Sequence, residues 1–116
     1  MTRERRDQLI DAYFAAMDND NFELVEPAIS ENIRFESASG SVSSLEGFRE
    51  YTEESRMISD SVHEVTRRIH AENASVCEGN VRGQTPEGPI EGAFCDVFEF
   101  DDDEERVTRI SVYTRM

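Results

Sequence analysis

The chain has 116 residues, and its 26 Asp and Glu against 12 Lys and Arg give a formal net charge of -14 at pH 7. A chain of this length fits one hydrophobic core, so we expect residues 1–116 to form a single domain. A field this negative repels phosphate groups, which excludes nucleic acid and anionic membrane surfaces as expected partners.

The basic residues are all Arg, which together with the acidic excess indicates a protein kept soluble at very high salt. We therefore expect a halophilic, acidic protein, although a codon bias that replaces Lys by Arg would leave the same pattern. The charged N-terminus is followed by no apolar segment of signal-peptide or membrane-spanning length. This predicts a cytoplasmic protein, in which Cys77 and Cys95 stay reduced.

The first half of the chain is predicted to contain three helices and one strand. Residues Arg3–Asp18 place apolar side chains at helical spacing, namely Leu9, Ile10, Tyr13, Phe14 and Met17. An Asp/Asn run ends this helix, and Phe22–Ser30 is predicted as a short second helix. Alternation over Ile33–Ser37 predicts a strand. Beyond a small-residue loop at Ser39–Ser44, spacing from Leu45 toward Ile58 predicts the third helix.

The second half of the chain alternates as strands do. Four strands are predicted, over Val62–Ala71, Ala74–Arg82, Ile90–Phe100 and Val107–Thr114. Turn-type sequences at Gly83–Pro89 and Asp101–Arg106 join them. The order α-α-β-α-β-β-β-β, with the helices on one side of an antiparallel sheet, is that of an α+β fold.

The segment from residue 94 to residue 100 carries the most informative side chain of the sequence. Period-two alternation places Asp96 on one strand face with the rings of Phe94, Phe98 and Phe100. If that face is the inner one, desolvation raises the pKa of Asp96 and favours the neutral acid, which can donate a hydrogen bond. Three ordinary explanations stay open: a bulge turns Asp96 outward, Arg82 or Arg109 pairs with it, or a buried water satisfies it.

Several segments keep the order and spacing of a known superfamily: Leu9–Met17, Phe22–Val25, Glu31–Gly40, Gly47–Tyr51, Asp96–Phe100 and Arg106–Ile110. In these segments, which extend over nearly all of the chain, the sequence resembles the nuclear transport factor 2-like superfamily, in its ketosteroid isomerase and SnoaL-like polyketide cyclase branch. The resemblance implies a cystatin-like roll, in which a strongly bent antiparallel sheet wraps into a cone, three N-terminal helices close it, and a pocket lies inside.

The resemblance also implies roles for two residues. In ketosteroid isomerase a tyrosine and a protonated aspartic acid hold an enolate oxygen, and a second aspartate moves the proton. Tyr13 falls at the position of that tyrosine and Asp96 at that of the acid, so both are candidate catalytic residues; taken alone, a tyrosine on the apolar stripe of a helix is more often a core residue with a satisfied hydroxyl. Ser37 stands at the position of the base, where a hydroxyl cannot shuttle a proton as a carboxylate can. The adjacent Glu36 is expected to point away from the inner face.

Strand and helix phase predict which side chains line the pocket. The expected ligand-binding residues are Met17, Phe35, Ser37, Phe48, Tyr51, Val81, Phe98, Ile110, Val112 and Thr114. Gly79 and Gly83 lie where family members often carry bulky residues, so they either widen the cavity or let the sheet bend more sharply. Cys77 is expected to point inward and Cys95 outward, so the two should not form a disulfide.

Metal and phosphate chemistry have little support in the sequence. His63 and His70 differ in strand parity, so they are expected on opposite faces, with a surface or capping role. The run Asp101–Glu105 lacks the glycine and bidentate glutamate of a calcium loop and is expected to be a solvated hairpin tip. No glycine-rich phosphate loop precedes a predicted helix. We therefore expect neither a metal nor an organic cofactor.

These observations predict a protein that binds a small, mostly apolar molecule through a carbonyl or phenolic oxygen. If it is an enzyme, the expected chemistry is that of an isomerase, cyclase or lyase acting through an enolate held by Tyr13 and Asp96, with the base unidentified. The alternatives are a non-catalytic homodimeric scaffold whose interior holds no cavity and a domain that binds a partner protein. The resemblance itself implies a homodimer.

Overall fold

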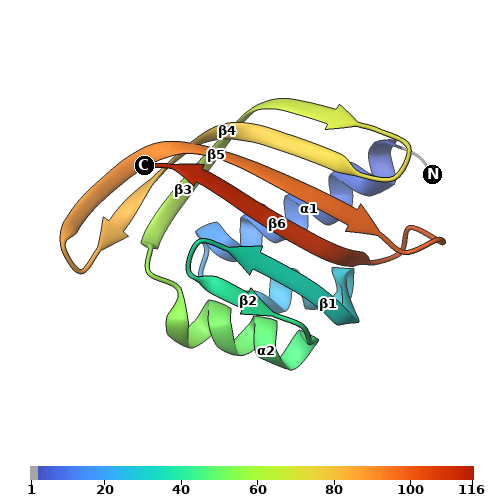
Figure 1. The fold of residues 1–116 in the computed structure, drawn as a ribbon, viewed down its shortest axis with the longest axis horizontal. Helices are drawn as coiled ribbons and strands as arrows, with labels where there is room; N and C mark the ends of the chain where they lie inside the picture. The colour runs from blue at the N-terminus through green and yellow to red at the C-terminus, as the bar shows by residue number, and fades with distance from the viewer. Residues whose placement is uncertain (1–2) are drawn as a thin grey trace.

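The computed structural model describes residues 3–116, which form a curved six-stranded sheet with the strand order β2-β1-β6-β5-β4-β3 (Figure 1). The strands are β1 (Ile29–Ser37), β2 (Gly40–Val42), β3 (Ser59–His70), β4 (Ser75–Thr85), β5 (Gly88–Phe100) and β6 (Val107–Arg115). Figure 1 shows helix α1 behind the long bent strands and helix α2 beside β1 and β2. The predicted α+β class with a strongly bent sheet is confirmed.

Two α-helices, not three, occur in the described part of the chain: α1 (Arg3–Asp18) and α2 (Leu45–Glu50), which continues as one π-helical turn over Tyr51–Ser55. The predicted helix over Phe22–Ser30 is wrong, because two short 3-10 turns and the first residues of β1 occupy this segment. Pro27 explains the failure, since proline lacks a donor and disfavours helical backbone at the preceding residue. None of the helices in residues 3–116 is long and apolar enough to cross a membrane.

The sequence had predicted a wholly antiparallel sheet, and this prediction is wrong for one pair of strands. β1 and β6 pair in parallel, with Phe35 opposite Ile110, while every other neighbouring pair in the described sheet is antiparallel. The predicted loop at 39–44 contains β2, which pairs with the end of β1. The predicted turn Gly83–Pro89 is mostly strand, because β4 and β5 continue to Thr85 and from Gly88. These longer strands carry the bend that encloses the site.

A β-bulge in β3 changes which side chains face the helix. The register with β4 shifts between Val65 and Arg67, so that one extra residue of β3 is inserted into the ladder. An extra residue reverses the facing of every side chain beyond it. His63 and His70 consequently lie on the same side of the sheet, and both hydrogen-bond to aspartates of α1. The prediction that they face opposite sides is therefore wrong.

Gly79 is the β4 residue opposite this bulge. A Cβ atom at Gly79 would lie 1.9 Å from the carbonyl oxygen of Glu64, so no larger residue fits without moving backbone. Of the two predicted effects of this glycine, the structure therefore favours the sharper bend of the sheet.

The hydrophobic core lies between α1 and the inner face of the sheet. The predicted apolar stripe of α1 is buried, comprising Leu9, Ile10, Tyr13, Phe14 and Met17. Beside it, Phe48 of α2 stacks on Phe35 of β1 with ring centroids 4.8 Å apart, and Phe98 of β5 closes on α1. This packing fixes α1 and α2 against the sheet and leaves a hollow between the core and the C-terminal half of β6.

Candidate functional site

A cavity of ≈ 230 Å³ opens between α1, the π-helical turn and the inner face of the sheet. Most of the residues predicted to line a pocket line this one, namely Tyr13, Met17, Phe35, Ser37, Tyr51, Val81, Asp96, Val112 and Thr114. Asp96 and Tyr13 are only 1% and 4% exposed, whereas Met57 and Met116, which also line the cavity, are at least half exposed. Asp96 and Tyr13 therefore lie at its closed end and the two methionines at its mouth.

Three residues predicted as ligand contacts lie elsewhere. Phe48, Phe98 and Ile110 are fully buried in the hydrophobic core and do not line the cavity. Their strands and helix do turn them inward, as phase predicts, but other side chains cover them. The prediction that these three contact a ligand is not supported by the structure.

Asp96 lies in the middle of β5, between Cys77 of β4 and Val112 of β6. Its Oδ1 atom is buried and has no hydrogen-bond partner in residues 3–116. Burial penalises the charged form and raises the pKa of Asp96 from 3.8 to about 8. At neutral pH the carboxyl group is therefore mainly protonated and can donate a hydrogen bond into the cavity.

Two of the ordinary explanations for Asp96 fail. A bulge does not turn it outward, since it is buried and in regular register with both neighbouring strands. Neither arginine pairs with it: Arg82 is exposed, and Arg109 bonds Glu36 and Glu99 on the outer face. Glu36 thus points away from the cavity, as predicted.

Tyr13 reaches the cavity from the third turn of α1. Its ring packs edge-on against Phe14 and Phe98, with centroids 5.1 and 5.5 Å away. Burial, and then the nearby Asp96 carboxyl group, raise the pKa of Tyr13 well above 10.0. The phenol therefore stays protonated, and its hydroxyl makes no hydrogen bond within the described chain. It is a second donor available to a ligand.

Ser37 and Tyr51 form a more distant polar pair on the cavity wall. The Ser37 Oγ and Tyr51 Oη atoms are 3.4 Å apart, and the backbone N–H of Ser39 donates to the same Oγ. Tyr51 opens the π-helical turn, an irregularity that is frequent at functional sites. This pair offers hydroxyl groups but no carboxylate that could act as a base.

Two charged or titratable residues that were not predicted as site residues also line the cavity, Arg56 and His63. Arg56 donates to the carbonyl oxygen of Met17 and to Ser61 Oγ, both at 3.0 Å. It follows the π-helical turn, where helical spacing no longer tells which way a side chain points. His63 had been expected in a surface or capping role. It lies two residues before the apolar Val65 on the same strand, and this spacing indicated that both side chains face inward.

The cysteines lie on opposite sides of the sheet, as predicted, and both are free. Cys77 is fully buried, and this burial raises its pKa to about 12. It is therefore an inert thiol beside Asp96. No group of three or more His, Cys, Asp or Glu side chains that could hold a metal ion occurs in residues 3–116.

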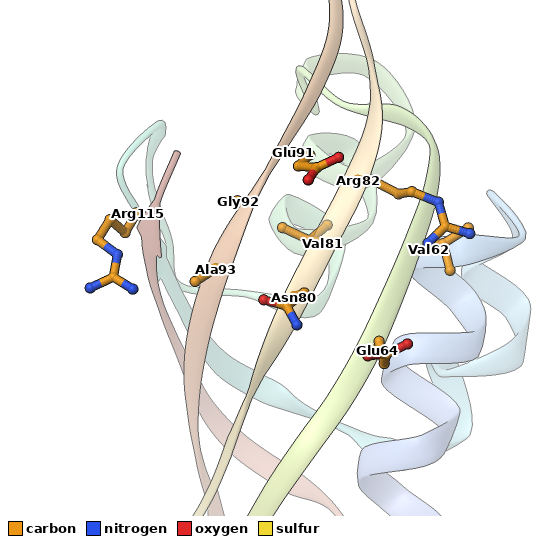
Figure 2. A pocket seen from close by; sticks show the side chains of 9 residues that line it. All are labelled: Val62, Glu64, Asn80, Val81, Arg82, Glu91, Gly92, Ala93 and Arg115. Atoms are coloured by element: carbon orange, nitrogen blue, oxygen red, sulfur yellow. The ribbon is translucent and has the colours of Figure 1, made fainter.

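A second hollow, of ≈ 480 Å³, lies along β3, β4 and β5 (Figure 2). Glu64, Asn80, Arg82 and Glu91 line it, and all four are exposed side chains that alternate with the inward ones. It contains neither Tyr13 nor Asp96. The cavity between α1 and the sheet, with its buried and unpaired polar groups, is therefore the better candidate site.

A model of the SnoaL-like domain family matches residues 10–110 of the chain. No curated protein matches it in sequence. Among solved structures, an LEH-like epoxide hydrolase of M. tuberculosis is 17% identical with a TM-score of 0.80, over 97% of this chain and 84% of that one. TerC, co-crystallised with polyporic acid, is 12% identical with a TM-score of 0.81, over 96% and 92%.

A protein with a ketosteroid isomerase-like fold from Catenulispora acidiphila, in complex with trimethylamine, is 14% identical with a TM-score of 0.79, over 91% of this chain and 84% of that one. At such low identities these three likenesses show a shared fold and no more.

Proposed function

The chain belongs to the SnoaL-like domain family of the nuclear transport factor 2-like superfamily, and from this premise we propose that it binds a small molecule through an oxygen held by Tyr13 and Asp96. The supporting observation is that Asp96, whose buried Oδ1 atom has no hydrogen-bond partner in residues 3–116, lines the same cavity as Tyr13. A buried polar atom without a partner costs about 1–3 kcal/mol, which a ligand oxygen would recover.

The cavity limits the size and chemistry of the ligand. Its ≈ 230 Å³ is below the about 300 Å³ at which cavities for drug-sized ligands begin. Its walls include Phe35, Phe94, Val81 and Val112, so most of the ligand surface must be apolar. A planar molecule of one or two rings that carries a carbonyl or phenolic oxygen fits both limits.

If the protein is an enzyme, the two donors suit an isomerase, cyclase or lyase that passes through an enolate, because hydrogen bonds to the developing oxyanion strengthen in the transition state. The lining residues supply this role without a metal or organic cofactor. The further parts of the proposal are a single domain over residues 1–116, a cytoplasmic location, adaptation to high salt, and a homodimer formed through the open face of the sheet. That face carries polar and amphipathic side chains such as Arg109 and Tyr113.

A non-catalytic scaffold is the alternative, and it requires a filled interior and a paired or solvated Asp96. The cavity argues against a filled interior, and the absence of a protein partner for Asp96 Oδ1 in residues 3–116 argues against a paired Asp96.

Calorimetric titration of 2-naphthol into the wild type and into Asp96→Ala tests the proposal. We expect micromolar affinity for the wild type and a loss of about tenfold or more in the variant, equivalent to about 1.4 kcal/mol. The buffer contains about 2 M KCl, so that self-repulsion does not unfold the protein and imitate lost binding. Asp102→Ala, which changes an exposed hairpin carboxylate, is the matched control. Absence of binding by the folded wild type, or equal binding by wild type and Asp96→Ala, would favour the scaffold.

A further inference from the structure

The proposed site has two hydrogen-bond donors but lacks a base at the position where Ser37 stands. A base must lie on the cavity wall, carry a free lone pair, and be held in one orientation. His63 of β3 lines the same cavity as Asp96 and Tyr13 and meets these requirements.

The imidazole of His63 is held by two neighbouring aromatic rings and, at one edge, by a carboxylate. Its ring packs against Phe14 and Phe94, each with a centroid distance of 5.2 Å. Nδ1 lies 2.5 Å from Asp18 Oδ1. This contact places the proton on Nδ1, because a carboxylate accepts hydrogen bonds. The opposite ring nitrogen, Nε2, has no hydrogen bond within residues 3–116, and in the neutral imidazole with its proton on Nδ1 this atom carries an unshared electron pair.

Asp18, at the end of α1, is itself fixed by several donors. Its Oδ1 atom accepts from Ser61 Oγ at 2.8 Å, and its Oδ2 atom accepts from the backbone N–H of His63 at 2.9 Å. Burial opposes ionisation of Asp18, but the hydrogen bonds from His63 and Ser61 outweigh it and lower the pKa of this carboxyl group. Arg56 donates to Ser61 Oγ and so extends the network. The carboxylate is therefore charged and immobile at neutral pH.

The geometry points to His63, oriented by Asp18, as the base that removes a proton from a carbon of the bound molecule, whose class is an enolisable ketone of one or two rings. This inference rests on the proposed function, since it needs the ketone oxygen held by Tyr13 and Asp96. The arrangement of carboxylate, imidazole and reacting group is the one by which proteins generally orient a histidine base.

The chemical step balances without a further reactant. His63 Nε2 takes the proton from the carbon next to the carbonyl, and the electrons of that C–H bond form a carbon–carbon double bond. The carbonyl π electrons move to the oxygen, to which Tyr13 and neutral Asp96 donate hydrogen bonds. The proton on Nε2 then returns to the same carbon or to a conjugated one, which regenerates the base.

Hydrogen–deuterium exchange of 2-tetralone in deuterated buffer, followed by the loss of its α-proton NMR signals, measures this step directly. We expect the wild type to accelerate exchange and His63→Gln to reduce the rate at saturating ketone by about 100-fold or more, with the calorimetric affinity for the ketone unchanged. His70→Gln is the matched control. His70 lies on the same strand and also bonds an aspartate of α1, Asp7 at 3.1 Å, but it does not line the cavity.

Asp18→Asn provides a second variant that keeps His63 itself. As a positioning residue, Asp18 should affect the exchange rate at saturation, by about tenfold or more, and not the affinity. A merely structural Asp18–His63 contact predicts lower stability in both variants with unchanged exchange per folded molecule, and that result would overturn the inference.

Ketone binding by a wild type that does not accelerate exchange would also overturn the inference while leaving the proposed binding function intact. Absence of ketone binding by the folded wild type would remove the proposed function and the inference with it.

Discussion

Asp96→Asn removes a carboxyl group that the fold holds neutral, and we predict a stability difference that depends on pH. Burial raises the pKa of Asp96 from 3.8 to about 8 in the folded state. Below pH 3.8 the group is protonated in both the folded and the unfolded chain. As the pH rises above this value, only the unfolded chain releases the proton. The folded state of the wild type therefore loses about 1.4 kcal/mol of stability per pH unit, until the pH reaches the folded-state pKa.

This loss amounts to about 4 kcal/mol at neutral pH and levels off at about 6 kcal/mol in alkali. Asp96→Asn carries an uncharged amide of the same shape, so this position contributes no pH dependence in the variant. The free energy of unfolding of the wild type minus that of the variant should therefore fall steadily across the window from pH 3.8 to about 8. Subtracting the two proteins cancels the titration of the other acidic groups.

Urea denaturation followed by far-ultraviolet circular dichroism, at closely spaced pH values and constant high salt, measures this difference. Asp102→Asn, which changes an exposed carboxylate, is the matched control. A difference for Asp96→Asn that does not change with pH would refute the claim that Asp96 is buried as a neutral acid.

Three further predictions follow from the packing, the thiols and the charge. Gly79→Ala should lower the free energy of unfolding by about 2 kcal/mol or more in urea denaturation, because its Cβ would lie 1.9 Å from a carbonyl oxygen; unchanged stability would contradict the close approach. A thiol reagent at mildly alkaline pH should label Cys95 and not Cys77 in the native protein, because Cys77 is fully buried with a pKa of about 12, and mass spectrometry would show any double labelling that contradicts this. The melting temperature should rise by about 5 °C or more from about 0.1 to about 2 M KCl as self-repulsion is screened, and a melting temperature independent of salt would count against salt adaptation.

Period-two alternation predicted the inner face of the sheet well, because it depends only on neighbouring residues. It placed Asp96 on the face of β5 that carries Phe94 and Phe98, which the structure shows to be buried, and Glu36 on the outer side of β1, which is confirmed. Phase tells which face a side chain joins but not how deeply other elements cover it. Phe48 and Ile110 therefore joined the core and not the cavity, because their covering partners come from distant parts of the chain.

Apart from the helix over Phe22–Ser30, which Pro27 prevents locally, the main predictions that failed depend on contacts between distant residues. The bulge between Val65 and Arg67 is stabilised across the sheet by Gly79, and a single strand read alone gives no sign of it. Beyond the bulge, the side chains of β3 therefore face the opposite way from the prediction, and His70 lies on the same face as His63. The parallel pairing of β1 with β6 likewise joins segments more than seventy residues apart. His63 became visible as a candidate base only when the structure brought Asp18 to it.

The pH dependence of the affinity for 1-tetralone tests the central claim most directly, because this ketone has no group that titrates in the neutral range. Neutral Asp96 donates a hydrogen bond to the carbonyl oxygen, and its carboxylate form cannot. Calorimetry should therefore show a constant affinity in mildly acidic buffer and a fall as the pH passes about 8, the pKa of Asp96. Asp96→Asn, whose amide donates at every pH, should show no such fall. A wild-type affinity independent of pH, or an equal fall in Asp96→Asn, would contradict the account.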